Sequence, residues 1–207
     1  MDAAAALVGN PGAGLGDTGG VAVRTLGDSG GVAVRTLGDY WRPDRDERTD
    51  IGELVHRAKD CDDPRAATDL AERFARLVGS LPRADGGLPR LVTPVPSRPA
   101  VDGSRDRPHL ADLLAAALAA AGAGAYRPGL VVKGNATPRL RHVDPARRAE
   151  VAASAAYRAR ESVAGRHVVV VDDVVLTGIT LHAVAACLLD AGAASVTAAA
   201  AARTRLR

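Results

Sequence analysis

Aromatic residues are nearly absent from this chain of 207 residues, in which Phe, Trp and Tyr together account for 2%. Exposed aromatic rings stack the bases of single-stranded nucleic acid, so the chain offers little for that mode of binding. The net charge of +3 leaves a nucleic-acid partner open but does not by itself indicate one. A core without aromatic side chains must be built from Ala, Val and Leu, which favours helices packed on a Val-rich sheet.

Cysteine and long apolar runs are scarce as well. Cys61 and Cys187 can form at most one disulfide and cannot make a zinc site unaided, so we interpret them as reduced, partly buried thiols of an intracellular protein. No run of about 18 apolar residues lacks a charge or a helix breaker, so no transmembrane helix is expected. Residues 1–8 contain no basic residue and precede Gly and Pro, which argues against a signal peptide. We therefore expect a cytoplasmic protein without a membrane partner.

The N-terminal region is low in complexity and contains a tandem duplication. Residues 1–20 are rich in Ala and Gly and are expected to be flexible. Residues 16–26 are followed at once by a near copy at 27–37, and each copy contains a short run with β propensity. Two copies are too few for a solenoid. They either form a hairpin that covers the functional site or reflect a recent duplication with one redundant copy, and we favour the second interpretation.

Two helices are expected after the duplication, and strands alternate with helices beyond them. Asp50 and Glu53 form an acidic capping box for the first helix. Asp63 and Pro64 begin the second helix, and Gly79 is a suitable end for it. The remaining expected elements are strands at 91–95, 130–133, 167–171 and 195–201 and helices at 109–121, 180–189 and part of 145–159.

The later strands are almost entirely apolar. Apolar strands separated by helices are typical of a parallel sheet that is covered on both faces. Ligands bind such sheets at the carboxyl ends of the strands. We therefore expect the chemistry to follow Val95, Lys133 and Val171.

Residues 168–180 give the strongest functional signal in the chain. Four valines indicate a buried strand that stops at two adjacent carboxylates, Asp172 and Asp173, and a tight loop then leads into a helix. Unpaired backbone N–H groups and the helix dipole favour a phosphate at such a helix N-terminus. Two threonine hydroxyls add donors, and Gly178 allows close approach of the backbone or a positive φ. The two carboxylates must serve something neutral or cationic, such as a ribose diol or a magnesium ion.

Other interpretations of this segment are an ordinary βα unit or another nucleotide-binding loop. A Walker-type loop is excluded because there is no Gly-Lys-Ser/Thr ending, and a dinucleotide fingerprint because Gly-x-Gly-x-x-Gly is missing. Position by position, the segment resembles the phosphoribosyl-diphosphate motif of type I phosphoribosyltransferases. Tyr40 and residues 51–59, 92–98 and 137–148 look like the ComF group of that superfamily. The resemblance extends from about Val32 to the C-terminus.

The resemblance implies an α/β fold of the type I phosphoribosyltransferase kind, with a central parallel sheet flanked by helices and a small N-terminal hood. We divide the chain into a flexible N-terminus (residues 1–20), a hood or helical region with the repeat (21–88) and a phosphoribosyltransferase core (89–207). The implied reaction binds 5-phosphoribosyl 1-diphosphate with Mg²⁺ and transfers the phosphoribosyl group to an unknown nitrogenous acceptor, releasing pyrophosphate. A homodimer is compatible with this interpretation.

The resemblance also assigns roles to residues. Asp172 and Asp173 are expected to bind the ribose hydroxyls, to act in catalysis and to hold the metal through ribose or water. The 5′-phosphate loop is expected to consist of Val175, Leu176, Thr177, Gly178, Ile179 and Thr180. Ser97 and Arg98 fall where the family binds pyrophosphate, for which a guanidinium is well suited, although Arg98 has a solvated loop arginine as its alternative. A mobile loop that closes over the site, or alternatively a basic surface loop, contains Arg139, Arg141, Arg147 and Arg148.

The chain departs from the ComF group in two ways. It has no N-terminal four-cysteine zinc module, and the Gln and Asn of the mobile region are not evident. These departures favour a rival hypothesis, in which a non-catalytic ComF-like protein keeps the phosphoribosyl pocket and has a regulatory role in DNA uptake or nucleotide metabolism. The intact Asp172–Asp173 pair favours a phosphoribosyltransferase, which is our leading hypothesis. The sequence identifies neither the acceptor nor the general base.

Overall fold

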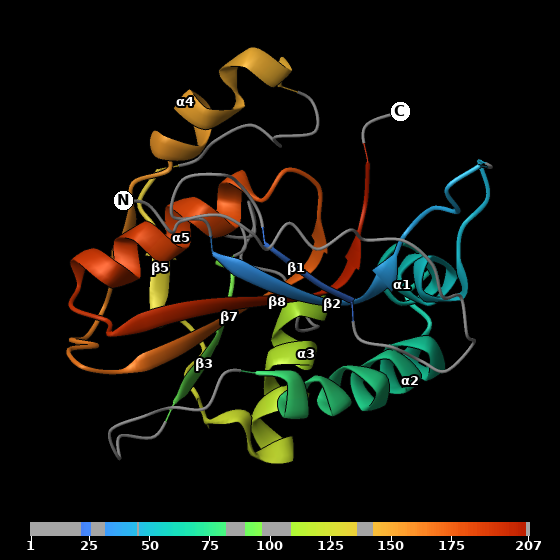
Figure 1. The fold of residues 1–207 in the computed structure, drawn as a ribbon, viewed down its shortest axis with the longest axis horizontal. Coiled ribbons are helices and arrows are strands. Elements are labelled where there is room, and N and C mark those ends of the chain that lie inside the picture. Colours follow the sequence, from blue (N-terminus) through green and yellow to red (C-terminus); the bar gives the residue numbers. More distant parts are fainter. Residues whose placement is uncertain are drawn as a thin grey trace, which may run out of the picture.

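The centre of the fold is a six-stranded sheet with strand order β1-β2-β8-β7-β3-β4 (Figure 1). The computed structural model describes residues 22–25, 32–44, 46–81, 90–96, 109–135 and 143–205. The strands of this sheet are β1 (Ala22–Thr25), β2 (Ala33–Asp39), β3 (Leu91–Pro94), β4 (Ala125–Tyr126), β7 (His167–Val175) and β8 (Ser195–Arg203). In the spatial order that runs from β2 through β8, β7 and β3 to β4, each strand is parallel to its neighbour. The outermost strand, β1, runs antiparallel to β2.

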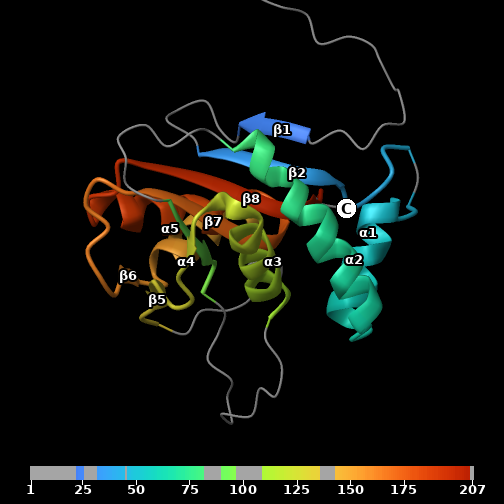
Figure 2. The same cartoon turned by 90° about the horizontal axis from the view of Figure 1, so that it is seen from below.

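Helices cover both faces of this sheet (Figure 1 and Figure 2). They are α1 (Asp50–Asp60), α2 (Pro64–Ala75), α3 (Leu110–Leu118), α4 (Arg148–Ala153) and α5 (Ile179–Asp190), with short turns η1 (Arg76–Ser80), η2 (Ala119–Ala123) and η4 (Pro145–Arg147). Because side chains alternate along a strand, Val169 and Val171 of β7 join the core under α1, α2 and α3, while Val168 and Val170 join the core under α5. This arrangement confirms the expected α/β fold with a parallel sheet flanked by helices.

One expected strand lies outside the main sheet. β5 (Val131–Lys133) pairs antiparallel with β6 (Tyr157–Ala159) in a separate two-stranded sheet. The edge beside β3 is taken by β4, since the backbone N–H groups of Ala125 and Arg127 already donate to the carbonyls of Arg90 and Val92 at 2.8 Å. The chain reaches residue 131 only after that edge is filled. The expectation that the strand ending at Lys133 belongs to the main parallel sheet is therefore wrong.

The helix caps agree with the sequence for α2 and differ for α1. Asp63 caps α2 by accepting hydrogen bonds from the N–H groups at the helix start, and Pro64 is the first helical residue, as predicted. The cap of α1 is Thr49 rather than Asp50: its Oγ1 accepts from the backbone N–H of Gly52 at 3.0 Å. Thr49 also donates to the carbonyl of Asp39 at the end of β2, and this second contact decides the position of the cap.

Glycine at position 52 lets α1 pack against the segment that follows β2. A Cβ atom there would lie 2.0 Å from the carbonyl oxygen of Tyr40. The backbone N–H of Tyr40 in turn donates to the carbonyl of Arg203 at 2.7 Å, which ties this segment to the end of β8. The start of α1 is thus held against the carboxyl edge of the main sheet.

The two copies of the duplicated sequence pair with each other. Ala22 lies opposite Thr36 and Thr25 opposite Ala33, so identical four-residue runs meet in antiparallel register. The second copy, in β2, joins the parallel sheet beside β8, whereas the first copy is the outermost strand. Residues 26–31, which contain the expected turn, lie outside the described part of the chain. β8 separates this pair of strands from β7, the strand with the two adjacent carboxylates.

Two further expectations concern the burial of the cysteines and the absence of a transmembrane helix. Both cysteines are free, and Cys187 is partly buried, but Cys61 is exposed rather than partly buried as expected. Cys61 is the C-terminal cap of α1 and lies at the turn into α2. Within the described ranges, no helix is long and apolar enough to span a bilayer.

Candidate phosphoribosyl site

β7 continues through the acidic pair and ends at Val175, four residues later than the sequence predicts. Its pairing with β8 extends to Val175, opposite Arg203, whereas its pairing with β3 ends at Val171, opposite Pro94. Asp172 and Asp173 therefore lie on a part of β7 that projects beyond β3. Among the described residues no strand pairs with β7 on this side of the acidic pair, and both carboxylates are partly exposed.

The two carboxylates face different elements. Asp173 lies on the face of β7 that packs against α1. Its Oδ2 atom lies 2.6 Å from the Nζ atom of Lys59, at the end of that helix. Asp172 lies on the other side of β7, where the burial of Tyr157 in β6 and then the charge of Asp172 raise the pKa of Tyr157. The backbone N–H of Asp173 donates to Asp172 Oδ1 at 2.8 Å, and that of Val174 donates to Asp173 Oδ1 at 2.7 Å. Each carboxylate is thus oriented by the backbone and keeps an oxygen for another partner.

The Asp172 carboxyl has a strongly perturbed pKa. Burial raises it from the ordinary value of 3.8 to about 7, and the neighbouring charge of Asp173 acts in the same direction. The backbone N–H of Asp173 and the ammonium of Lys59 lower it in part. A carboxyl with a pKa near neutral is able to accept or release a proton during a reaction at physiological pH.

The loop between β7 and α5 has a backbone geometry that suits an anion. Gly178 adopts φ 77°, in the left-handed region, and precedes the first residue of α5 without a side-chain hydrogen bond that caps the helix. The first N–H groups of this 12-residue helix are therefore available to a ligand, and the helix dipole favours a negative one. Thr177 is exposed and Thr180 is partly exposed. Val175 is buried and anchors the loop by accepting from the N–H of Thr204 at 2.8 Å.

A comparison with protein families agrees with this geometry. Residues 111–206, slightly less than half of the chain, match the family model described as the phosphoribosyl transferase domain. The matched segment includes β7 with its acidic pair, the loop and α5. The parallel sheet flanked by helices, together with this match, fits a type I phosphoribosyltransferase fold. No curated protein matches the chain.

Solved structures similar to this chain include hypoxanthine phosphoribosyltransferases. A glutamic acid mutant from a study of an invariant aspartic acid in HPRTs is 17% identical, with a TM-score of 0.36, over 72% of this chain and 67% of that chain. The hypoxanthine phosphoribosyltransferase of Trypanosoma cruzi is 18% identical, with a TM-score of 0.35, over 72% of this chain and 66% of the enzyme. At this level of similarity, the substrates of these enzymes are not assigned to the present protein.

Of the other residues that the sequence predicts for the site, the structure describes only some. Ser97, Arg98, Arg139 and Arg141 lie outside the described part of the chain. Arg147 is exposed, with its Nε atom 3.5 Å from Glu150. Arg148 is only 4% exposed, and its Nε donates to the carbonyl of Val143 at 3.1 Å. Arg148 is therefore packed at the start of α4 and is not an exposed loop residue.

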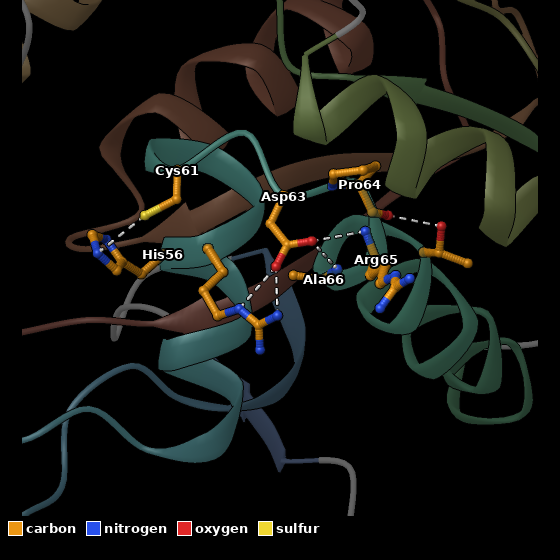
Figure 3. A network of polar contacts seen from close by, with 8 residues as sticks. His56, Cys61, Asp63, Pro64, Arg65 and Ala66 are labelled. Carbon is orange, nitrogen blue, oxygen red and sulfur yellow. Dashed lines mark hydrogen bonds and ion pairs between the residues drawn. The ribbon is translucent and has the colours of Figure 1, made fainter.

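Lys59 is a site residue to which the sequence analysis gave no role. It lies within residues 51–59, one of the segments that resemble the ComF group, but its partner Asp173 is far away in sequence. Figure 3 shows the turn that fixes this end of α1: Asp63 accepts from the backbone N–H groups of Arg65 and Ala66 and from Arg57 Nε at 3.0 Å. Arg57 and these N–H groups lower the pKa of Asp63. The turn thereby holds Lys59 beside the acidic pair.

Proposed function

We propose that this protein binds 5-phosphoribosyl 1-diphosphate at the carboxyl end of β7 and transfers its phosphoribosyl group to a nitrogenous acceptor, with release of pyrophosphate. The observation that supports this proposal most is the combination of two adjacent, partly exposed carboxylates with an uncapped helix N-terminus in the next turn of chain. The carboxylates suit a diol and the helix N-terminus suits a phosphate. A ribose 5-phosphate presents both groups on one small molecule.

Asp172 and Asp173 bind the ribose in this proposal. Each carboxylate accepts a hydrogen bond from one of the 2′- and 3′-hydroxyls, and both stabilise the positive charge that develops on the ring as pyrophosphate leaves. In the present structure Lys59 forms an ion pair with Asp173, with 2.6 Å between Nζ and Oδ2. An incoming diol therefore shares Asp173 with Lys59 or displaces it, which makes Lys59 a residue that adjusts the charge of the site.

The loop from residue 175 to residue 180 binds the 5′-phosphate in this proposal. Backbone N–H groups at the start of α5 donate to the phosphate oxygens, and Thr177 and Thr180 add hydroxyl donors. Gly178 supports this role because its φ of 77° is favourable for glycine and because it has no side chain between the backbone and a ligand. Leu176 and Ile179 complete the loop without polar groups of their own.

Magnesium fits this site as a partner of the substrate. Among the described residues, no cluster of three or more His, Cys, Asp or Glu could hold a metal ion. Mg²⁺ commonly uses one or two carboxylates together with substrate oxygens, a donor set that Asp172 and Asp173 can complete directly or through ribose and water. The ion would neutralise charge on the leaving pyrophosphate. The roles of Ser97 and Arg98 at pyrophosphate, and of Arg139 and Arg147 in closing the site, are proposed from the sequence.

We place the protein in the ComF-like group of the superfamily as part of the same proposal. Support comes from α1, which lies outside the family match at 111–206 and brings Lys59 to the acidic pair. A cytoplasmic location belongs to the proposal too. A homodimer is compatible with the proposal, which does not depend on the oligomeric state. The rival role, a regulatory protein that binds the sugar without transfer, shares this site and differs only in turnover.

The test is pyrophosphate release from 5-phosphoribosyl 1-diphosphate and Mg²⁺ in the presence of a panel of nitrogenous acceptors. Release that depends on one class of acceptor supports transfer. Binding of the sugar diphosphate without release, across a panel that includes bases and amines, would instead support the regulatory role. A matched control is Asp190→Asn, which changes an exposed carboxylate at the far end of α5 and is expected to leave release unchanged.

A further inference from the structure

A groove between α2 and α3 opens beside the acidic pair. It has a volume of about 890 Å³ and ends at Lys59 and Asp173. Figure 2 shows α2 and α3 side by side on the face of the sheet opposite α5. This volume lies towards the upper end of the range of small-molecule pockets, about 300–1,000 Å³, so the groove has room for a molecule larger than one nucleobase.

Alanine side chains keep the groove open. Ala67, Ala71 and Ala75 recur every fourth residue on one face of α2, and Ala117 of α3 and Ala120 of η2 line the facing side. Larger side chains close the space below, where Leu70, Phe74, Leu114 and Leu118 are fully buried in the core. The groove is therefore a shallow apolar channel above a packed floor.

Two further features indicate that the groove receives a ligand. Leu113 lines it and remains 38% exposed, one of two large hydrophobic side chains exposed among the described residues. The carboxylates of Asp62, Asp63, Glu72 and Asp173 line the groove together with Lys59 and His109. Asp173 is paired with Lys59 and Asp63 with Arg57, and the carboxylates still outnumber the cationic groups of the lining. The apolar wall and the acidic end together favour a molecule with a hydrocarbon or aromatic body and a cationic head.

The position of the groove relates it to the proposed reaction. The acceptor must reach C1 of the ribose, which is bonded to the carbon that bears the 2′-hydroxyl. In the proposed function that hydroxyl is held by the acidic pair, so the acceptor nitrogen must lie beside Asp172 and Asp173. Among the described residues, the groove provides such a place, because Asp173 forms part of its wall.

We infer that the groove between α2 and α3 is the acceptor site and that the acceptor is a primary amine with an apolar body. This inference rests on the proposed function. The ammonium group enters at the acidic end and gives one proton to a carboxylate there. The neutral nitrogen then supplies the electron pair for the new N–C1 bond while the C1–O bond breaks and its electron pair leaves with pyrophosphate. The second proton that the nitrogen sheds passes to a carboxylate or to water.

The test uses 2-phenylethylamine as the probe, 2-phenylethanol as an uncharged molecule of similar shape, and hypoxanthine as a nucleobase. Calorimetry measures the binding of each to the full-length protein with 5-phosphoribosyl 1-diphosphate and Mg²⁺ present, and pyrophosphate release is followed in parallel. The amine is expected to bind at least about tenfold more tightly than the alcohol, since the acidic end recognises its charge. Ala71→Leu and Ala117→Leu fill the groove and should weaken the amine by about tenfold or more, while the affinity for the sugar diphosphate stays within about twofold.

Controls separate loss of the site from loss of the fold. Ala186→Leu makes the same change at an exposed position of α5 away from the groove and should bind the amine like the unaltered protein. Glu72→Gln, at an exposed position on the groove wall, removes one charge without adding bulk and should weaken the amine by about threefold.

Three results would overturn the inference. The first is unchanged amine affinity in both leucine variants. The second is binding of the sugar diphosphate without any binding of the amine, which leaves the proposed function intact and places the acceptor elsewhere. The third is a change of oligomeric state in Ala71→Leu or Ala117→Leu by light scattering, which would make the groove an interface between copies of the chain. Failure of the unaltered protein to bind the sugar diphosphate would overturn the proposed function, and the acceptor role with it.

Discussion

Replacing Asp172 with Asn should change how the stability of the protein depends on pH. The pKa of this carboxyl is about 7 in the folded protein, above its ordinary value of 3.8, so the folded state binds the proton more tightly than the unfolded chain. The stabilisation from that proton is fully present below the lower value, decreases as the pH rises through the interval between the two, and is absent above the higher value. Asn cannot titrate, so the variant lacks this loss.

The size of the effect follows from the shift. A shift of about three pKa units corresponds to about 4 kcal/mol. Asp172 is partly exposed, and solvent screening reduces the difference to about 1–2 kcal/mol. Urea unfolding measured at about pH 4 and about pH 8 gives the free energy of unfolding of both proteins. Between these conditions the unaltered protein should lose about 1–2 kcal/mol relative to Asp172→Asn.

A matched control and a second variant make this experiment decisive. Asp190→Asn should follow the unaltered protein at both pH values, because its carboxylate is exposed at the end of α5. Lys59→Met removes a charge that lowers the pKa of Asp172, so the loss of stability should extend to higher pH. If Asp172→Asn differs from the unaltered protein by the same free energy at both pH values, the carboxyl is not perturbed as the structure indicates.

Three further substitutions or deletions test the fold and the phosphate loop. Gly52→Ala should destabilise the protein by about 1–3 kcal/mol, because its Cβ atom would meet the carbonyl oxygen of Tyr40, whereas Gly79→Ala, with no atom within 4 Å, should be neutral or slightly stabilising in the same urea unfolding experiment. Gly178→Ala should cost about 1 kcal/mol of stability from its φ of 77° and weaken binding of 5-phosphoribosyl 1-diphosphate by calorimetry; unchanged affinity would remove the loop from the site. Deletion of residues 16–26 removes the outermost strand and should lower the melting temperature by only a few degrees, about 1 kcal/mol or less, whereas a large drop would show that both copies stabilise the fold.

The parts of the fold that local sequence decides were predictable. Asp63 and Pro64 mark the start of α2 because the cap and the fixed φ of proline act within one turn of helix. The strand–loop–helix order around Gly178 was likewise readable from valines, an acidic pair and a glycine. The end of β7 was not, because polar residues usually end a strand, and here pairing with β8 continues past them to Val175.

The parts that depend on distant partners were not predictable from one sequence. The short run Val131–Lys133 looks the same in sequence whether it joins the main sheet or pairs with β6, and competition for the edge of β3 decides between them. Thr49 caps α1 in place of Asp50 because it also contacts Asp39 at the end of β2. Lys59 joins the site only because the turn between α1 and α2 directs it toward Asp173.

The central claim is that the acidic pair on β7 holds the ribose of an activated sugar phosphate. Calorimetric titration of 5-phosphoribosyl 1-diphosphate with Mg²⁺ into the unaltered protein and into the double variant Asp172→Asn, Asp173→Asn tests it most directly, with circular dichroism to verify that the variant is folded. We predict measurable affinity in the unaltered protein and its loss in the folded double variant. Equal affinity in the two proteins, or no binding by either, would contradict the claim.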